Sequence, residues 1–169
     1  MADGYQFPSG ALMAGRRGVV MGVANDKSIA WGVASQLAAQ GASVIITYQG
    51  ESLARRVQPL ADSIGAKLVD ADVTDDASMD AAFARIAELT GGRLDALVHS
   101  IAFADKDELK GSFVENTTRD SFLKAMNISV FSFVDSARRA AALMQPGGSI
   151  VTMTYLGSER VIPNYNTMG

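Results

Sequence analysis

Residues 17–50 read RGVVMGVANDKSIAWGVASQLAAQGASVIITYQG. The short apolar run 17–22 is typical of a strand that is buried on both faces. From Ser28 onward, apolar residues recur at helical spacing as far as Gly41, where a glycine can form the left-handed end of a helix. The run 43–48 is rich in β-branched residues and predicts a second strand. These residues therefore predict a strand, a helix and a parallel strand in succession.

The same alternation continues to the last residue. Further strands are predicted at 67–73, 94–100 and 149–154, and further helices at 53–64, 75–89 and 118–144. We expect Pro59 to kink or shorten the first of these helices, Thr118 to cap the last, and a surface loop at 105–110. Right-handed crossovers then give an α/β fold, a Rossmann-type doubly wound parallel sheet of order 3-2-1-4-5 with helices on both faces. We expect residues 1–14 to be a flexible lead and residues 15–169 to form one dinucleotide-binding domain.

Composition excludes several classes of function. The 169 residues are 48% hydrophobic and 20% charged, which suits a globular protein with a core. The net charge of -3, with no block of like charge, argues against a nucleic-acid partner. No cysteine and a single histidine argue against disulfides and metal sites. Neither a signal peptide nor a membrane span is predicted, so we expect a cytoplasmic protein without a membrane partner.

Ligands of such sheets bind beyond the carboxyl ends of the strands, so the residues that follow each strand form the candidate site. After the first strand, Gly22 permits a tight turn, and the helix that begins near Ser28 offers free amide groups to an anion. The spacing differs from the usual G-x-G-x-x-G motif. A glycine turn with a serine cap and no ligand is therefore an alternative reading of this segment.

The ends of the second and third strands carry polar groups that suit a nucleotide. Gln49 can hydrogen-bond a ribose without repelling a neighbour. Arg55 and Arg56 could meet the 2′-phosphate of NADPH, but basic residues at such positions are more often solvated, so NADH is favoured. Asp72 and Val73 could pair with the amine edge of an adenine, although an exposed loop aspartate is an equal alternative.

The ends of the fourth and fifth strands bear the candidate reactive groups. Residues 100–102 are small or apolar, as needed where a backbone approaches a ribose and a nicotinamide. We expect the neighbouring His99 to be a packed or hydrogen-bonded residue rather than an acid–base catalyst. Tyr155 and Tyr165 carry phenols with an ordinary pKa near 10, which can donate to a developing enolate or alkoxide. Two aromatic rings packed by a loop are the alternative.

Together these motifs resemble the bacterial enoyl-acyl-carrier-protein reductases of type II fatty acid synthesis, a divergent branch of the short-chain dehydrogenase/reductases. The resemblance runs from about Gly15 to the last residue. Ordinary short-chain dehydrogenases have a serine at the position of Thr152, whereas the enoyl reductases have the tyrosine seen at Tyr155. The motifs that carry the resemblance are Gly22-x5-Ser28-Ile29-Ala30-x-Gly32, Thr47-Tyr48-Gln49, Asp72-Val73, His99-Ser100-Ile101-Ala102 and residues 155–169.

The resemblance implies an oxidoreductase that transfers hydride from NADH, or less readily NADPH, to the β-carbon of an enoyl thioester on acyl carrier protein. This reaction is the last step of the fatty acid elongation cycle. Tyr165 would hydrogen-bond or protonate the enolate oxygen, and Tyr155 would help to orient it. The full-length relatives are commonly homotetramers. Matches to the family's cofactor contacts are Gly22, Ser28, Ile29, Gln49, Asp72, Val73, Ser100 and Ile101. Matches to its acyl pocket are Ala104, Tyr155, Tyr165 and Met168.

The family's catalytic lysine lies seven residues beyond the position of Tyr165, and the sequence ends four residues beyond it. We therefore expect a segment of a longer enzyme, C-terminally incomplete, inactive as written, and with its fifth strand left as an unprotected edge. Two other functions stay open. One is a non-catalytic NAD-binding Rossmann module, and the other is a short-chain dehydrogenase that reduces carbonyl groups.

Overall fold

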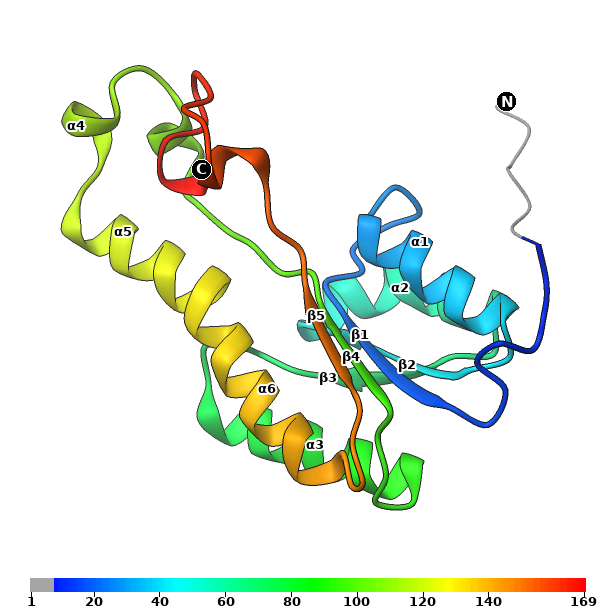
Figure 1. The fold of residues 1–169 in the computed structure, drawn as a ribbon. Helices are drawn as coiled ribbons and strands as arrows, with labels where there is room; N and C mark the ends of the chain where they lie inside the picture. Colours follow the sequence, from blue (N-terminus) through cyan, green and yellow to red (C-terminus); the bar gives the residue numbers. More distant parts are fainter. Residues whose placement is uncertain (1–7) are drawn as a thin grey trace.

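The computed structural model of the protein describes residues 8–169 (Figure 1). Five strands pair in parallel in the order β3-β2-β1-β4-β5, which confirms the predicted sheet and its order. The last three strands are shorter than predicted: β3 and β5 end earlier, and β4 begins later and ends one residue earlier. The strands are β1 (Arg17–Met21), β2 (Ser43–Tyr48), β3 (Lys67–Asp70), β4 (Ala96–His99) and β5 (Ser149–Thr152).

Two layers of helices cover the sheet (Figure 1). Because successive strand residues point to opposite faces, Val19 and Val20 belong to different clusters of buried side chains. One cluster includes residues of α1 (Ile29–Ala39) and α2 (Gly50–Ser63). The other includes residues of α3 (Asp76–Thr90) and α6 (Ser132–Leu143). Helices therefore pack on both faces, as the doubly wound arrangement predicts.

The helix α2 continues through Pro59, so the expectation of a shortened helix is wrong, whereas the alternative of a kink stays a prediction. A proline inside a helix removes one backbone hydrogen bond and disfavours the preceding turn. Val57 and Ala61, on either side of Pro59, are fully buried in the core. Tertiary packing supplies most helical stability in proteins, and here it outweighs the local cost of the proline.

The predicted helix 118–144 is divided into three parts. These are α5 (Arg119–Met126), a π-helical turn η2 (Asn127–Phe131) and α6. Thr118 caps α5 as predicted, and its hydroxyl accepts from the Ser121 amide at 3.2 Å in a capping box. The predicted surface loop contains the short helix η1 (Lys106–Leu109), and α4 (Phe113–Asn116) follows it. Two further short helices, η3 (Leu156–Ser158) and η4 (Asn166–Met168), come after β5.

The part of the predicted flexible lead that the structure describes, residues 8–14, forms a turn against the end of α1. The Gly10 amide donates to the carbonyl of Ala39 at 2.9 Å, and the Met13 amide donates to the carbonyl of Gln40 at 2.8 Å. Residues 1–7 of that lead lie outside the described residues. Within residues 8–169, no helix combines the length and the apolar character that crossing a membrane requires.

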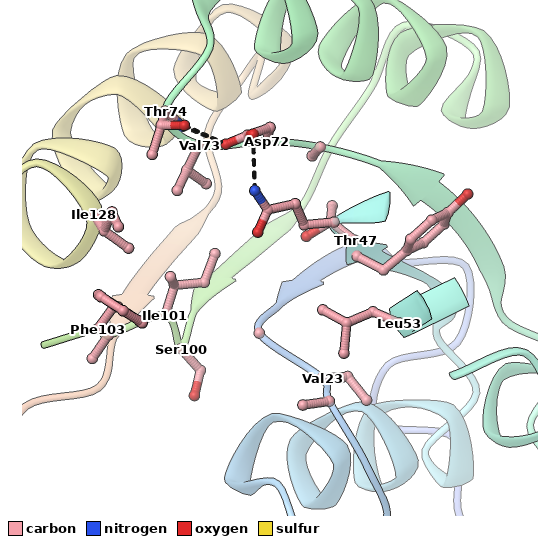
Figure 2. A pocket seen from close by; sticks show the side chains of 16 residues that line it. Val23, Thr47, Leu53, Asp72, Val73, Thr74, Ser100, Ile101, Phe103 and Ile128 are labelled. Carbon is pink, nitrogen blue, oxygen red and sulfur yellow. Dashed lines mark hydrogen bonds between the residues drawn. The ribbon is translucent and has the colours of Figure 1, made fainter. Parts of the chain in front are cut away.

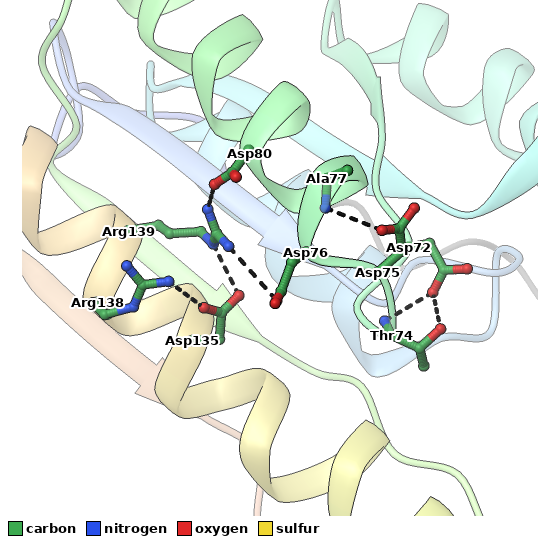
Figure 3. Close-up of polar contacts among 9 residues, drawn as sticks. All are labelled: Asp72, Thr74, Asp75, Asp76, Ala77, Asp80, Asp135, Arg138 and Arg139. Carbon is green, nitrogen blue, oxygen red and sulfur yellow. Dashed lines mark hydrogen bonds and ion pairs between the residues drawn. The ribbon is translucent and has the colours of Figure 1, made fainter.

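An ion-pair cluster joins α3 to α6 on one face of the sheet (Figure 3). Arg139 has a side chain only 10% exposed, and it donates to Asp135 on its own helix at 2.9 Å. The same guanidinium pairs with Asp80 of α3 and lies 3.9 Å from Asp76. The neighbouring Arg138 donates to Asp135 at 2.7 Å. A nearly buried cation thus ties α3 to α6, the helix that follows the turn η2.

Asp95, just before β4, is a buried carboxylate at the end of the sheet opposite the strand carboxyl ends. It accepts hydrogen bonds from the Arg16 guanidinium at 3.0 Å, the Arg17 amide at 3.0 Å and the Arg93 guanidinium at 2.9 Å. Burial by itself raises the pKa of Asp95, but these donors outweigh burial and lower the pKa to about 2. The folded state therefore favours the ionised carboxylate.

We expect this carboxylate to make folding acid-sensitive. Because the folded pKa lies below the unfolded one, Asp95 stabilises the fold fully above pH ~5, and its contribution disappears as the pH falls toward ~2. Solvent screens the half-exposed arginines, so we expect a contribution of about 1–2 kcal/mol. Urea unfolding of wild type and Asp95→Asn from neutral to acid pH measures this contribution. A stability difference that stayed constant over the whole range would contradict the assignment.

Candidate active site

The carboxyl ends of β1, β2, β3 and β4 converge on a first cavity of about 400 Å³ (Figure 2). These ends lie side by side because the strands are parallel, so residues far apart in the sequence meet at one edge of the sheet. Six of the eight predicted cofactor contacts line this cavity. They are Gly22, Gln49, Asp72, Val73, Ser100 and Ile101.

Gly22 is required by a close approach between two chain segments. Its φ is +97°, a left-handed conformation that favours glycine. A Cβ atom at this position would lie 2.0 Å from the carbonyl oxygen of Ser100. The turn after β1 therefore packs directly against the backbone after β4, and only a glycine fits there.

Ser28 shapes the turn after β1 and lines neither of the two cavities described here. Its hydroxyl accepts from the amides of Ala24 at 3.0 Å and Asn25 at 3.1 Å. It makes no side-chain cap to α1, so the serine cap of the alternative reading is not formed. The first turn of α1 still has amide groups without intrahelical partners, the usual anion site of this fold.

Gln49 and Asp72 both line the first cavity, and their side chains are joined by a hydrogen bond. The Gln49 side-chain amide donates to the Asp72 carboxylate at 2.8 Å. The hydroxyl and amide of Thr74 donate to the same carboxylate at 2.7 and 2.8 Å (Figure 3). The hydrogen bond from the Thr74 hydroxyl is the main cause that lowers the pKa of Asp72, against a smaller opposing effect of burial. This edge of the cavity therefore carries a negative charge.

A second cavity of about 520 Å³ lies beside the first. Its walls come from the start of α1, from α5 and η2, and from the segment after β5. Tyr155 and Tyr165 both line it, with their rings stacked at a centroid distance of 4.4 Å and an angle of 25°. Met168 also lines it, and so does Ile29, which was predicted as a cofactor contact.

The two cavities share a wall. Ser100, Ile101 and Ala102, the residues directly after β4, line both of them. Ligands in the two cavities would therefore lie next to each other at the end of β4. Such an arrangement suits transfer of a small group between two bound molecules, with the phenols at hand to donate a proton or a hydrogen bond.

Ala104 lies outside the lining of either cavity. The sequence reasoning also missed lining residues from η2, because a regular helix through 118–144 gives no sign of the wider π turn. Ile128 lines the first cavity, and Ser129 and Val130 line the second. Phe103, which lines the first cavity, donates its amide to Ser129 at 3.0 Å.

His99 is an interior residue, as expected. It is only 1% exposed, and its Nε2 atom lies 2.7 Å from the hydroxyl oxygen of Ser132. Burial lowers the pKa of His99, so the imidazole is neutral at pH 7. It lines neither cavity.

The parallel sheet with helices on both faces defines a fold of the Rossmann type, and the glycine turn and the cavities lie at the strand ends where such folds bind nucleotides. A protein-family model described as "Enoyl-(Acyl carrier protein) reductase" matches residues 22–169. The chain belongs to this family, as the resemblance of its motifs predicts.

Curated relatives and solved structures agree with this placement. Enoyl-[acyl-carrier-protein] reductase [NADH] 1 of Rhizobium meliloti is 52% identical over 159 residues, covering 94% of this chain and 58% of the relative. The corresponding reductase of Enterococcus faecalis is 55% identical over 151 residues, covering 89% of this chain and 59% of the relative. The Anaplasma phagocytophilum reductase, solved in complex with NAD, superposes with a TM-score of 0.92 at 49% identity, covering 97% of this chain and 63% of that one. The chain thus spans about three fifths of the length of its curated relatives.

Proposed function

We propose that the protein reduces the 2,3-trans double bond of enoyl thioesters carried by acyl carrier protein, with NADH as hydride donor. The observation that carries this proposal is the wall of residues 100–102, shared by a nucleotide-sized cavity and a second cavity with two phenols. Family membership supports the same reaction, since the relatives' names give both the acyl-carrier-protein substrate and NADH.

The residues of the first cavity fit a dinucleotide. Asp72 and Val73 would hold the adenine, Gln49 a ribose hydroxyl, and the turn at Gly22 with the start of α1 the pyrophosphate. Ser100 and the adjoining backbone would hold the nicotinamide half at the shared wall. Bound there, NADH supplies the hydride.

Charge in the first cavity favours NADH over NADPH. The carboxylate of Asp72, held ionised beside Gln49, would repel a 2′-phosphate. Arg55, which could meet such a phosphate, pairs with Glu51 at 3.3 Å. The solved Bacillus cereus reductase, 49% identical to this chain, is described with NADP⁺. The rates of reaction with NADH and with NADPH should therefore be compared directly.

The second cavity would take the acyl chain and its thioester. Tyr165 would hydrogen-bond or protonate the enolate oxygen that forms when hydride reaches the β-carbon, and Tyr155 would help to orient it. Met168 would contact the acyl chain. The same role stays a prediction for Ala104.

We propose in addition that the 169 residues are a segment of a longer protein, and that this longer protein is a homotetramer. The support is a group of large apolar side chains on α5, η2 and α6 that are exposed in the single chain. Exposed apolar surface of this kind is typical of protein–protein interfaces. Light scattering of the purified longer protein would give the oligomeric state. The cytoplasmic location, and the inactivity of the 169-residue chain by itself, stay predictions.

The test of the function uses the longer protein with crotonyl and longer enoyl thioesters of acyl carrier protein. We expect NADH consumption with these substrates, slower reaction with NADPH, and none with ketones. Reduction of ketones would instead identify a carbonyl-reducing dehydrogenase. Tight NADH binding without turnover on any thioester would identify a non-catalytic module.

A further inference from the structure

A chain of hydrogen-bonded polar side chains runs from the exposed Thr152, on the edge strand β5, into the interior of the protein beside the shared wall. The Thr152 hydroxyl on β5 lies 3.4 Å from Nδ1 of His99 on β4. The other ring nitrogen of His99 lies 2.7 Å from the Ser132 hydroxyl, at the start of α6. That hydroxyl donates to the carbonyl of Ile128, in the π turn η2, at 2.5 Å. Ser132 is fully buried and His99 is 1% exposed.

The donor and the acceptor of each hydrogen bond in this network can be assigned from the chemistry of the groups involved. The Ser132 hydroxyl has a single proton, which it donates to Ile128. The 2.7 Å contact with His99 is therefore a hydrogen bond only if Nε2 of the imidazole is the donor. The neutral ring then has an unprotonated Nδ1 atom, which accepts from Thr152. All hydrogen bonds in the chain consequently run in one direction, from β5 to η2.

Three of the four members of the chain line a cavity or directly precede a residue that does. Ser100, directly after His99, lines both cavities. Met153, directly after Thr152, lines the second cavity, and its amide donates to the His99 carbonyl at 3.0 Å. At the other end, Ile128 itself lines the first cavity. A shift in the imidazole would thus move the walls of both cavities.

Ser132, which contacts the imidazole, also bonds to the irregular part of the long helix. A π turn is rare and is found mostly at functional sites, and a side-chain donor on its carbonyl competes with the regular backbone pattern. The ring of Phe133, on α6, meets the ring of His99 edge-on at 5.5 Å and 61°. Side-chain contacts from β5 and α6 therefore fix both the position and the orientation of the imidazole.

We infer that His99 is a positioning residue for hydride transfer, which sets the shared wall by linking β5 to the π turn through Thr152, Ser132 and Ile128. This inference rests on the proposed function for its kinetic part. The adenine end of the first cavity is built by β2 and β3, away from the chain. Loss of these hydrogen bonds should therefore misplace the reacting groups more than it weakens cofactor binding.

The hydrogen bonds can be tested without any activity measurement. The 169 residues contain one histidine, so the imidazole nitrogens of the ¹⁵N-labelled chain give an unambiguous NMR signal. We expect the Nε2–H tautomer at neutral pH, with an Nε2 proton protected from exchange. Ser132→Ala should speed that exchange at least about tenfold, because the proton loses its partner. An Nδ1–H tautomer would overturn the inference.

The matched control is Ser136→Ala, one turn further along α6. Ser136 is fully buried like Ser132, but its hydroxyl has no hydrogen-bond partner among the described residues. In the longer enzyme we expect Ser132→Ala to lower kcat about tenfold, with the KM for NADH changed less than about twofold. Ser136→Ala should leave both near wild type, and Ser132→Thr should restore most of kcat.

Equal effects of the two alanine substitutions on kcat would overturn the positioning role. If the wild-type longer protein reduced no enoyl thioester, the proposed function would fail. The NMR result on the 169-residue polypeptide would still decide whether the hydrogen bonds of His99 are as inferred.

Discussion

Replacing Gly22 with alanine should abolish dinucleotide binding and destabilise the fold by about 3 kcal/mol or more. Two effects add at this position. The left-handed backbone, with φ of +97°, costs an alanine about 1–2 kcal/mol. The Cβ atom would also lie 2.0 Å from the Ser100 carbonyl oxygen, and this clash is with backbone that cannot rotate away. Relief of the clash requires β1 and β4 to separate at their ends, where the first cavity lies.

Gly65→Ala separates the two effects. Gly65 has a similar φ of +67°, but an added Cβ would meet no atom within 4 Å. This variant should lose only the backbone contribution of about 1–2 kcal/mol and should bind NADH like wild type. Urea unfolding and a fluorescence titration with NADH measure both quantities. Equal loss of stability in the two variants would show that the contact with Ser100 is unimportant.

Replacing Tyr165 with phenylalanine should lower the turnover of enoyl thioester by about 10²–10⁴-fold in the longer protein. The substitution removes only the hydroxyl, so the ring can still stack on Tyr155 at 4.4 Å. Cofactor affinity should change little, because Tyr165 lines the second cavity and not the first. Steady-state kinetics and NADH binding on the same preparations provide the two measurements.

Tyr155→Phe provides the comparison for this prediction. It makes the same chemical change in the partner ring, but we expect a smaller loss of turnover because Tyr155 is assigned to orientation rather than protonation. Equal losses of turnover and of NADH affinity in Tyr165→Phe would contradict the role assigned to Tyr165. A larger loss of turnover in Tyr155→Phe than in Tyr165→Phe would indicate that Tyr155 protonates the enolate and Tyr165 orients it.

Sequence reasoning was most successful at the strand ends. Parallel strands place their carboxyl ends along one edge, so Gly22, Gln49, Asp72 and Ser100 could be grouped without knowledge of side-chain contacts. The division of the predicted contacts between two cavities came from the family resemblance and not from the residues alone. Ile29 was expected beside the cofactor and lies in the second cavity, because a residue in the first turn of a helix can face either side of the turn.

The residues of η2 could not be predicted for a different reason. The apolar spacing across 118–144 fits an ordinary helix, whereas the π turn depends on contacts with distant residues. Ser132 meets His99 of β4, and Ser129 meets Phe103 in the loop after β4. The helix around Pro59 could not be predicted from local sequence for a similar reason. Burial of the neighbouring residues, and not local helix propensity, keeps α2 continuous.

Under the proposed function, the wall of residues 100–102 would restrict how the protein acquires a different acyl-length preference. A substitution there would alter both cavities together, so it could not make room for a longer acyl tail without disturbing the site proposed for the hydride donor. Met126 and Val130 line the second cavity alone. Natural or engineered divergence in substrate range should therefore accumulate on α5 and η2, while the end of β4 stays unchanged.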